Sequence, residues 1–134
     1  PPVGHTCTLR TGAHRNELAV GFTGWMTSYD LPHCLPGGDV LDHYVVPRAR
    51  GGGIALLLIH ATATAGASDD GRYLKGGAVP GGTGRRLYAR AAICGAGGDC
   101  TLSGRAFRHL AELPPQSIRS LTRSLPAREW NYEA

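Results

Sequence analysis

A potential base and a potential nucleophile stand side by side in this chain, at His33 and Cys34. Neighbouring side chains of an extended segment point to opposite sides, so we do not expect a catalytic Cys-His dyad there. A serine hydrolase would hold its nucleophile in a G-x-S-x-G turn, and no serine of the chain stands in that pattern. The sequence therefore argues against a hydrolase.

Metal and phosphate sites find little support either. The chain has no C-x2-C pair and its six histidines are scattered, so we expect no metal ion. Gly81-Gly82-Thr83-Gly84 lacks the lysine of a phosphate-binding loop and precedes no clear helix. The 14 basic residues, which give a net charge of +4, do not cluster with aromatic residues, so no nucleic-acid partner is expected.

The four cysteines, Cys7, Cys34, Cys94 and Cys100, are an even set in a small chain. Such a set favours two disulfides and an oxidising compartment, so we expect a secreted protein. Three pairings are open. We favour Cys94–Cys100, which closes a short glycine-rich loop, together with Cys7–Cys34, and four free thiols are the alternative.

The 134 residues are expected to form one domain, residues 1–134, with no membrane span. The longest apolar run is residues 54–59, far short of the roughly 20 residues that cross a bilayer. Residues 54–64 give the strongest strand signal, because an apolar run is followed by alternating Ala and Thr. Further strands are predicted at residues 5–10, 41–46 (ended by Pro47) and 117–121.

Helical segments are predicted to be few. Leu102, Ala106, Leu110 and Leu113 recur at helical spacing, which predicts a helix over residues 102–113 that Pro114 ends. Short helical turns are expected at residues 16–20 and 31–34, a flexible break at 51–53, and a long loop at 65–86 with a short strand at 72–74. The predicted core is Leu9, Phe22, Trp25, Val45, Leu56, Leu58, Ala106, Leu110 and Ile118.

Short stretches near the two ends of the chain carry a resemblance to a known family. They are Thr8-Leu9-Arg10, Gly21-Phe22-Thr23-Gly24-Trp25, Asp30-Leu31-Pro32-His33 and Pro114-Pro115-Gln116-Ser117-Ile118-Arg119. In type and order they resemble the catalytic subunits of the pertussis and cholera toxin kind, which are mono-ADP-ribosyltransferases. The resemblance implies an α+β fold with two small, split antiparallel sheets and short helices, here stabilised by disulfides.

The resemblance also implies roles for three residues if NAD binds. Arg10 matches the arginine that grips the NAD phosphates, and Trp25 matches a tryptophan near the nicotinamide pocket. His33 matches a histidine that supports the nucleophilic attack.

The catalytic groups of that family are missing. Its Ser-Thr-Ser strand edge falls on Val46-Pro47-Arg48, and its catalytic glutamate falls on Ala106. The nearest acids are Asp99 and Glu112, which only a shifted helix could bring to the site. Since such a carboxylate stabilises a cationic transition state, its loss costs on the order of a thousand-fold in rate. The sequence therefore favours a chain without enzymatic activity.

We accordingly predict a secreted, toxin- or effector-like virulence protein, a catalytically degenerate pseudoenzyme that binds a protein target and needs no cofactor. A separate delivery subunit is left open. Two alternatives remain: an active mono-ADP-ribosyltransferase that uses NAD, and a small secreted inhibitor or channel-binding toxin that presents residues 65–86.

Overall fold

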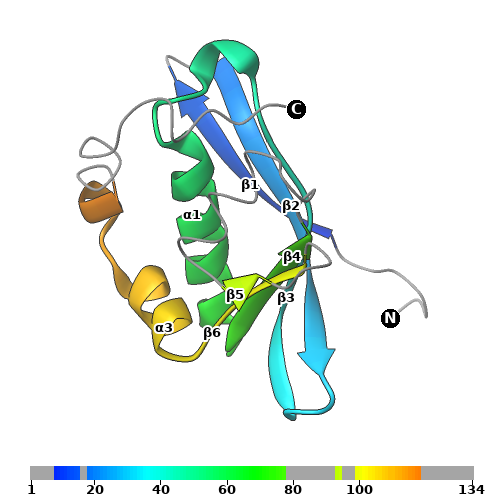
Figure 1. The fold of residues 1–134 in the computed structure, drawn as a ribbon. Coiled ribbons are helices and arrows are strands. Elements are labelled where there is room, and N and C mark those ends of the chain that lie inside the picture. The colour runs from blue at the N-terminus through cyan, green and yellow to red at the C-terminus, as the bar shows by residue number, and fades with distance from the viewer. Residues whose placement is uncertain (1–7, 16–17, 78–92, 95–98, 119–134) are drawn as a thin grey trace.

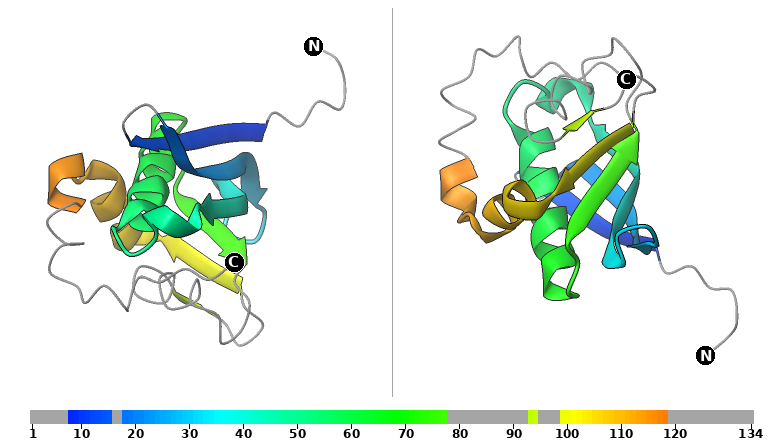
Figure 2. Two further views of the ribbon diagram at one scale, coloured as in Figure 1. Left: turned by 90° about the horizontal axis from the view of Figure 1, so that it is seen from above. Right: turned by 60° about the horizontal axis from the view of Figure 1, so that its bottom comes forward.

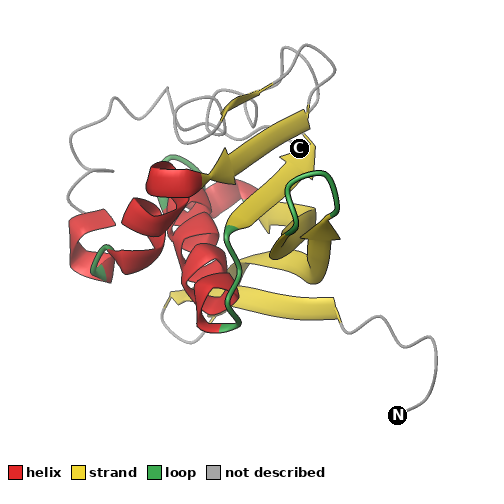
Figure 3. Ribbon diagram, turned by 90° about the horizontal axis from the view of Figure 1, so that it is seen from below, coloured by secondary structure: helices red, strands yellow, loops and turns green. Residues whose placement is uncertain are grey.

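The computed structural model describes residues 8–15, 18–77, 93–94 and 99–118. It confirms the predicted α+β class. Six strands form one mixed sheet in the order β1-β2-β3-β4-β6-β5, so the expected pair of split antiparallel sheets is wrong. The helices gather on one face of this sheet (Figures 1 and 3).

The first three strands form an antiparallel meander: β1 (Thr8–Arg15), β2 (Leu18–Asp30) and β3 (Leu35–Val45). The tip of the β2–β3 hairpin projects beyond the helices (Figure 1). β4 (Tyr73–Gly77) then lies parallel to β3, while β6 (Asp99–Ser103) pairs antiparallel with β4 and with β5 (Ile93–Cys94). The second half of the sheet thus joins the first only through the parallel pairing of β3 with β4 (Figure 2).

The segment predicted as the central strand is the long helix α1 (Ile54–Ser68), which carries the chain from β3 over to β4. Parallel neighbours require such a crossover. Alanine and leucine, which dominate the segment, are strong helix formers. Because α1 is buried on most of its sides, it lacks the polar stripe that marks a surface helix. Its apolar run therefore has the same sequence pattern as a buried strand.

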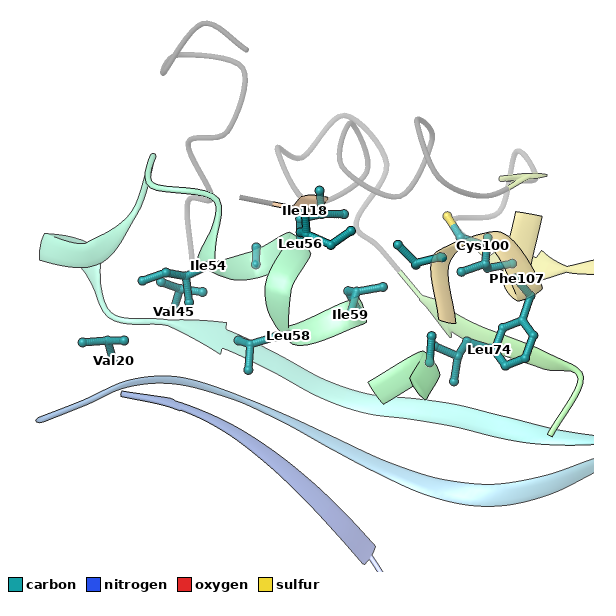
Figure 4. Packing of buried hydrophobic residues seen from close by; sticks show 14 of the residues in the cluster. Val20, Val45, Ile54, Leu56, Leu58, Ile59, Leu74, Cys100, Phe107 and Ile118 are labelled. Atoms are coloured by element: carbon teal, nitrogen blue, oxygen red, sulfur yellow. The ribbon is translucent and has the colours of Figure 1, made fainter. Parts of the chain in front are cut away.

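The core lies between the sheet and the helices α1 and α3 (Gly104–Glu112). Leu58 of α1 points towards the β2 and β3 ribbons near Val20 and Val45, while Phe107 of α3 lies next to Leu74 (Figure 4). Of the predicted core, the buried members are Trp25, Val45, Leu56, Leu58, Leu110 and Ile118. Phe22 and Ala106 are exposed, which corrects their assignment, and the side chain of Leu9 lies outside the described residues.

Several local predictions also change. Residues 18–20 begin β2 rather than continuing a helix, and residues 31–34 form the turn of the β2–β3 hairpin. Residues 117–118 are helical instead of extended, while 119–121 lie outside the described part. The helix over 102–113 is confirmed as α3, although Leu102 belongs to β6, and β3 ends before Pro47 as expected.

Gly37 and Gly38 lie inside β3, where side chains of neighbouring strands occupy the space beside them. A Cβ on Gly37 would come within 2.3 Å of the Tyr73 ring. A Cβ on Gly38 would lie 3.1 Å from Leu74 Cδ2 and 3.2 Å from Trp25 Cε3. Glycine therefore serves close packing here, not reversal of the chain.

Candidate functional site

The two parallel strands at the centre of the sheet stay together over a short length only. Residues 38–40 of β3 pair with 74–76 of β4, and no further pair follows among the described residues. At this point β3 carries a β-bulge: Val40 pairs with Trp25 and Asp42 with Gly24, which leaves Leu41 as the extra residue. A bulge bends its strand and increases the local twist. β3 therefore continues to its end at Val45 without β4 beside it.

The chain turns from the end of β3 into α1 through a short 3-10 helix, η1 (Pro47–Ala49), and the glycine loop, which we define as residues 50–53. Gly51 and Gly53 have φ values of 84° and 82°, a left-handed conformation that glycine adopts without strain. The sharp turn places the start of α1 at the carboxyl end of β3. In open sheets with parallel strands, this is where ligands bind.

The start of α1 has backbone donors to offer. Its first helical hydrogen bond runs from the Leu57 N–H to the Gly53 carbonyl, so the N–H groups of Ile54, Ala55 and Leu56 have no acceptor inside the helix. Gly53 provides no side-chain cap, and the first turn contains no acidic residue. Free N–H groups together with the positive end of the helix dipole make an anion-binding position.

A small pocket lies at this position. It is shallow and open to solvent, and it is lined by Val45, Ala49, Arg50, Gly51, Gly53, Ile54 and Ala55. Arg50 is half-buried in its wall. The pocket combines apolar walls, backbone donors and positive charge, which suits a ligand with an anionic group and an apolar part.

One histidine of β3 is buried in the sheet. His43 of β3 pairs with the fully buried Thr23 of β2 and is only 7% exposed. Burial lowers the pKa of His43 to about 4, although the Asp42 carboxylate beside it favours the charged form. His43 is therefore neutral at pH 7.

The residues that the sequence singled out do not come together. Arg10 lies on β1 opposite Gly24, at one edge of the sheet, whereas Asp99 and Glu112 are exposed on β6 and at the end of α3. The sheet order puts β2, β3 and β4 between β1 and β6. Trp25 is buried, with 2% of its surface exposed.

His33 lies exposed at the tip of the β2–β3 hairpin. Its ring Nδ1 is 2.9 Å from Asp30 Oδ2, and the backbone N–H of His33 donates to Asp30 Oδ1. These hydrogen bonds from His33 lower the pKa of the Asp30 carboxyl. The pair is a turn contact on the surface rather than part of a pocket.

The cysteines fulfil the expected pattern only in part. Cys34 is a free, exposed thiol, so the favoured Cys7–Cys34 pairing is wrong. The Cα atoms of Cys94 and Cys100 are register partners in β5 and β6, which is compatible with the other pairing. That disulfide stays a prediction.

Among the described residues, no group of three or more His, Cys, Asp or Glu side chains is placed to hold a metal ion. In the same part of the chain, no helix is long and apolar enough to cross a membrane.

The glycine loop is a candidate binding element that the sequence did not reveal. Residues 51–53 were expected to be a flexible break, and the segment after them a strand. The available signal was the combination of a strand ended by Pro47, a run of glycines, and an Ala/Leu-rich stretch long enough for a helix.

No family model matches the chain, and no curated protein sequence matches it. Solved structures do. The ribosomal-protein-alanine N-acetyltransferase from Brucella melitensis biovar Abortus 2308 matches with a TM-score of 0.58 and 28% identity over 65% of this chain and 62% of that one. A mutant of the toxin AtaT, solved with the C-terminus of the antitoxin AtaR, matches with a TM-score of 0.58 and 10% identity over 71% and 65%.

An integron cassette protein from the mobile metagenome of V. cholerae matches with a TM-score of 0.60 and 22% identity over 82% of this chain and 70% of that one. The chain thus spans less than two thirds of the length of the first two neighbours. These likenesses overturn the resemblance to mono-ADP-ribosyltransferases, and with it the predicted function as a degenerate toxin or effector of that kind. The chain has a GNAT-like α+β fold, the fold of an N-acetyltransferase.

Proposed function

We propose that this chain is an N-acetyltransferase, which takes an acyl group from a coenzyme A thioester and transfers it to a primary amine. The observation that carries the proposal is the uncapped start of α1, reached through the glycine loop at the carboxyl end of β3. The printed name of the Brucella neighbour, an alanine N-acetyltransferase, supports the reaction class.

The residues at the start of α1 fit the diphosphate of coenzyme A. Three backbone N–H groups, at Ile54, Ala55 and Leu56, lack an acceptor inside the helix, and no carboxylate stands in the first turn to compete with the ligand. Left-handed glycines at positions 51 and 53 let the backbone approach the ligand closely. Arg50 adds a positive charge to the pocket wall.

The bent end of β3 would orient the extended arm of the carrier. Beyond Val40 this strand has no β4 partner among the described residues, so an extended ligand could pair with this edge as another strand would, once the Val45 carbonyl is free of its hydrogen bond from Arg50. Coenzyme A supplies the acyl group as a thioester, an activated carbonyl. The protein's part is to hold that carbonyl where an amine can reach it, because positioning alone lowers such barriers by several kcal/mol.

The test is to place a negative charge at the start of α1. Gly52 is exposed and has no left-handed φ, so it accepts a side chain without strain. Gly52→Asp should weaken coenzyme A binding by about tenfold or more, because the carboxylate repels the diphosphate. The fold should not suffer, since an acid near a helix N-terminus stabilises by about 0.3–1 kcal/mol.

Gly52→Asn is the matched control, with the same shape and no charge, and should bind as the native chain does. Binding is measured by isothermal titration calorimetry. Transfer is followed by mass spectrometry of a peptide with an N-terminal alanine in the presence of acetyl-coenzyme A. The proposal fails if the native chain does not bind coenzyme A, or if the Asp and Asn variants bind it equally well.

A further inference from the structure

Arg50, the first residue of the glycine loop, lies back along the end of β3. Its Nε donates a hydrogen bond of 2.9 Å to the Val45 carbonyl, and its guanidinium carbon lies 5.6 Å from the centre of the Tyr44 ring. Its Nη2 is buried without a hydrogen-bond partner. No carboxylate among the described residues forms an ion pair with it. The guanidinium is thus held in place but only partly satisfied.

The Val45 carbonyl that Arg50 holds lies on the edge of β3 that faces away from β2. The N–H of Val46 donates to the Val20 carbonyl of β2 at 2.8 Å. The backbone groups of successive residues in a strand point to opposite edges, so those of Val45 point away from β2. This is the edge that β4 leaves open beyond the bulge. Arg50 therefore covers the backbone that an extended ligand would use.

Two acceptors compete for the same guanidinium. A buried donor of a charged group that finds no acceptor costs more than a neutral one, so the present position of Nη2 is unfavourable. A phosphate offers a planar guanidinium two parallel hydrogen bonds. Arg50 lines the same pocket as Gly53, Ile54 and Ala55, whose backbone forms the anion-binding start of α1. A bound diphosphate would lie within reach of the freed side chain.

We propose that Arg50 is a latch on the open edge of β3. In the free protein it closes the Val45 edge, and it releases that edge when an anionic group at the start of α1 takes over the guanidinium. The anionic part of the carrier thus opens the place for its neutral arm. This inference rests on the proposed function and adds an order to it: the diphosphate binds first and the arm second.

The latch predicts opposite effects on two fragments of coenzyme A. Arg50→Ala should weaken the binding of ADP, which contains the diphosphate, by about tenfold, because a charged hydrogen bond is lost. The same change should strengthen the binding of pantetheine, the neutral arm, by at least about threefold, because the Val45 edge is open from the start. Both dissociation constants are measured by NMR titration, and that of coenzyme A by calorimetry.

Two further variants separate the two roles of the side chain. Arg50→Gln keeps a donor for the Val45 carbonyl but has no charge, so it should weaken ADP and leave pantetheine unchanged. Arg48→Ala is the matched control, because Arg48 is a neighbouring arginine that is exposed on η1. It should change the binding of either fragment by no more than about twofold, since an exposed charge is screened.

The outcomes are distinct. If Arg50→Ala weakens the binding of both fragments, Arg50 is an ordinary binding or structural residue, and the latch is overturned. If the binding of neither fragment changes, the latch is overturned as well. If neither the native chain nor Arg50→Ala binds coenzyme A, the proposed function is wrong and the latch with it. If the native chain binds coenzyme A and the fragments respond with the same sign, only the latch is wrong.

Discussion

At the scale of single residues, His43 links the stability of the fold to pH. Its side chain is 7% exposed, and burial lowers its pKa from 6.5 to about 4. Between pH 6.5 and 4, His43 therefore binds a proton in the unfolded chain but not in the folded chain. The contribution of neutral His43 to the free energy of unfolding is complete above pH 6.5 and is lost as the pH falls through about 4. At about 1.4 kcal/mol per pKa unit, the loss is about 3 kcal/mol.

A comparison of the native chain with His43→Leu checks the direction in which stability changes with pH. The free energy of unfolding, measured with urea between pH 4 and 7.5, should fall less steeply towards acid in the variant, because only this proton uptake is removed. Titrating groups that do not interact with His43 contribute equally to both chains and cancel in the difference. Parallel curves for the two proteins would contradict the assignment.

At the level of single residues, the sequence predicted most of the core correctly but did not reveal the candidate site. Large apolar side chains such as Trp25 and Leu58 are buried as predicted, because burial follows residue type. Phe22, by contrast, is exposed and packs against Tyr44 on the sheet surface. The binding role that we propose for the glycine loop could not be predicted, because it would depend on backbone donors, which every residue but proline possesses.

At the scale of elements, α1 and α3 are fastened together by side chains of α1. The Thr64 hydroxyl has one proton to donate, and the Ala111 carbonyl of α3 and the His60 carbonyl of its own helix share it, each at 3.0 Å from the hydroxyl oxygen. His60 Nε2 lies 2.6 Å from the Leu113 carbonyl, and since a carbonyl only accepts, Nε2 carries the proton. These bonds satisfy carbonyl groups at the end of α3 that the helix itself leaves free.

Thr64→Val should therefore destabilise the protein by about 1 kcal/mol, because the shape is kept while a cross-helix hydrogen bond is lost. Ser68→Ala is the matched control: the Ser68 hydroxyl donates only to the Thr64 carbonyl of the same exposed helix end. Its change in stability should stay within about 0.5 kcal/mol. The test is to measure the urea midpoints of unfolding for the two variants. Equal losses of stability would show that the cross-helix hydrogen bond contributes nothing.

The assignment of helices and strands from the sequence was the least accurate prediction, and α1 shows why. A helix buried on most sides has no polar face, and periodicity then cannot separate it from a buried strand. Assigning residues 54–64 to a strand removed the helix that the glycine loop precedes, so the loop was taken for a break. The helix α3, which keeps an exposed polar side around the buried Phe107 and Leu110, was predicted correctly.

At the scale of the whole molecule, the sheet consists of two antiparallel parts that meet at one parallel seam. β1, β2 and β3 form one part, and β4, β6 and β5 form the other. The seam is the pairing of residues 38–40 with 74–76, and α1 bridges it by packing on both parts. The α+β class was expected from the resemblance to the toxin family, and it is confirmed although that resemblance is wrong. The resemblance misled because a strand followed by a turn and a proline pair after a helix recur in unrelated folds.

Trp25 gives this seam an optical consequence. Its ring lies against the backbone of Gly38, the residue of β3 that pairs with Leu74 of β4. An indole in that place should change its emission when the two parts of the sheet move relative to each other. With Trp130, the second tryptophan, replaced by phenylalanine, intrinsic fluorescence would follow the seam in solution without any attached label.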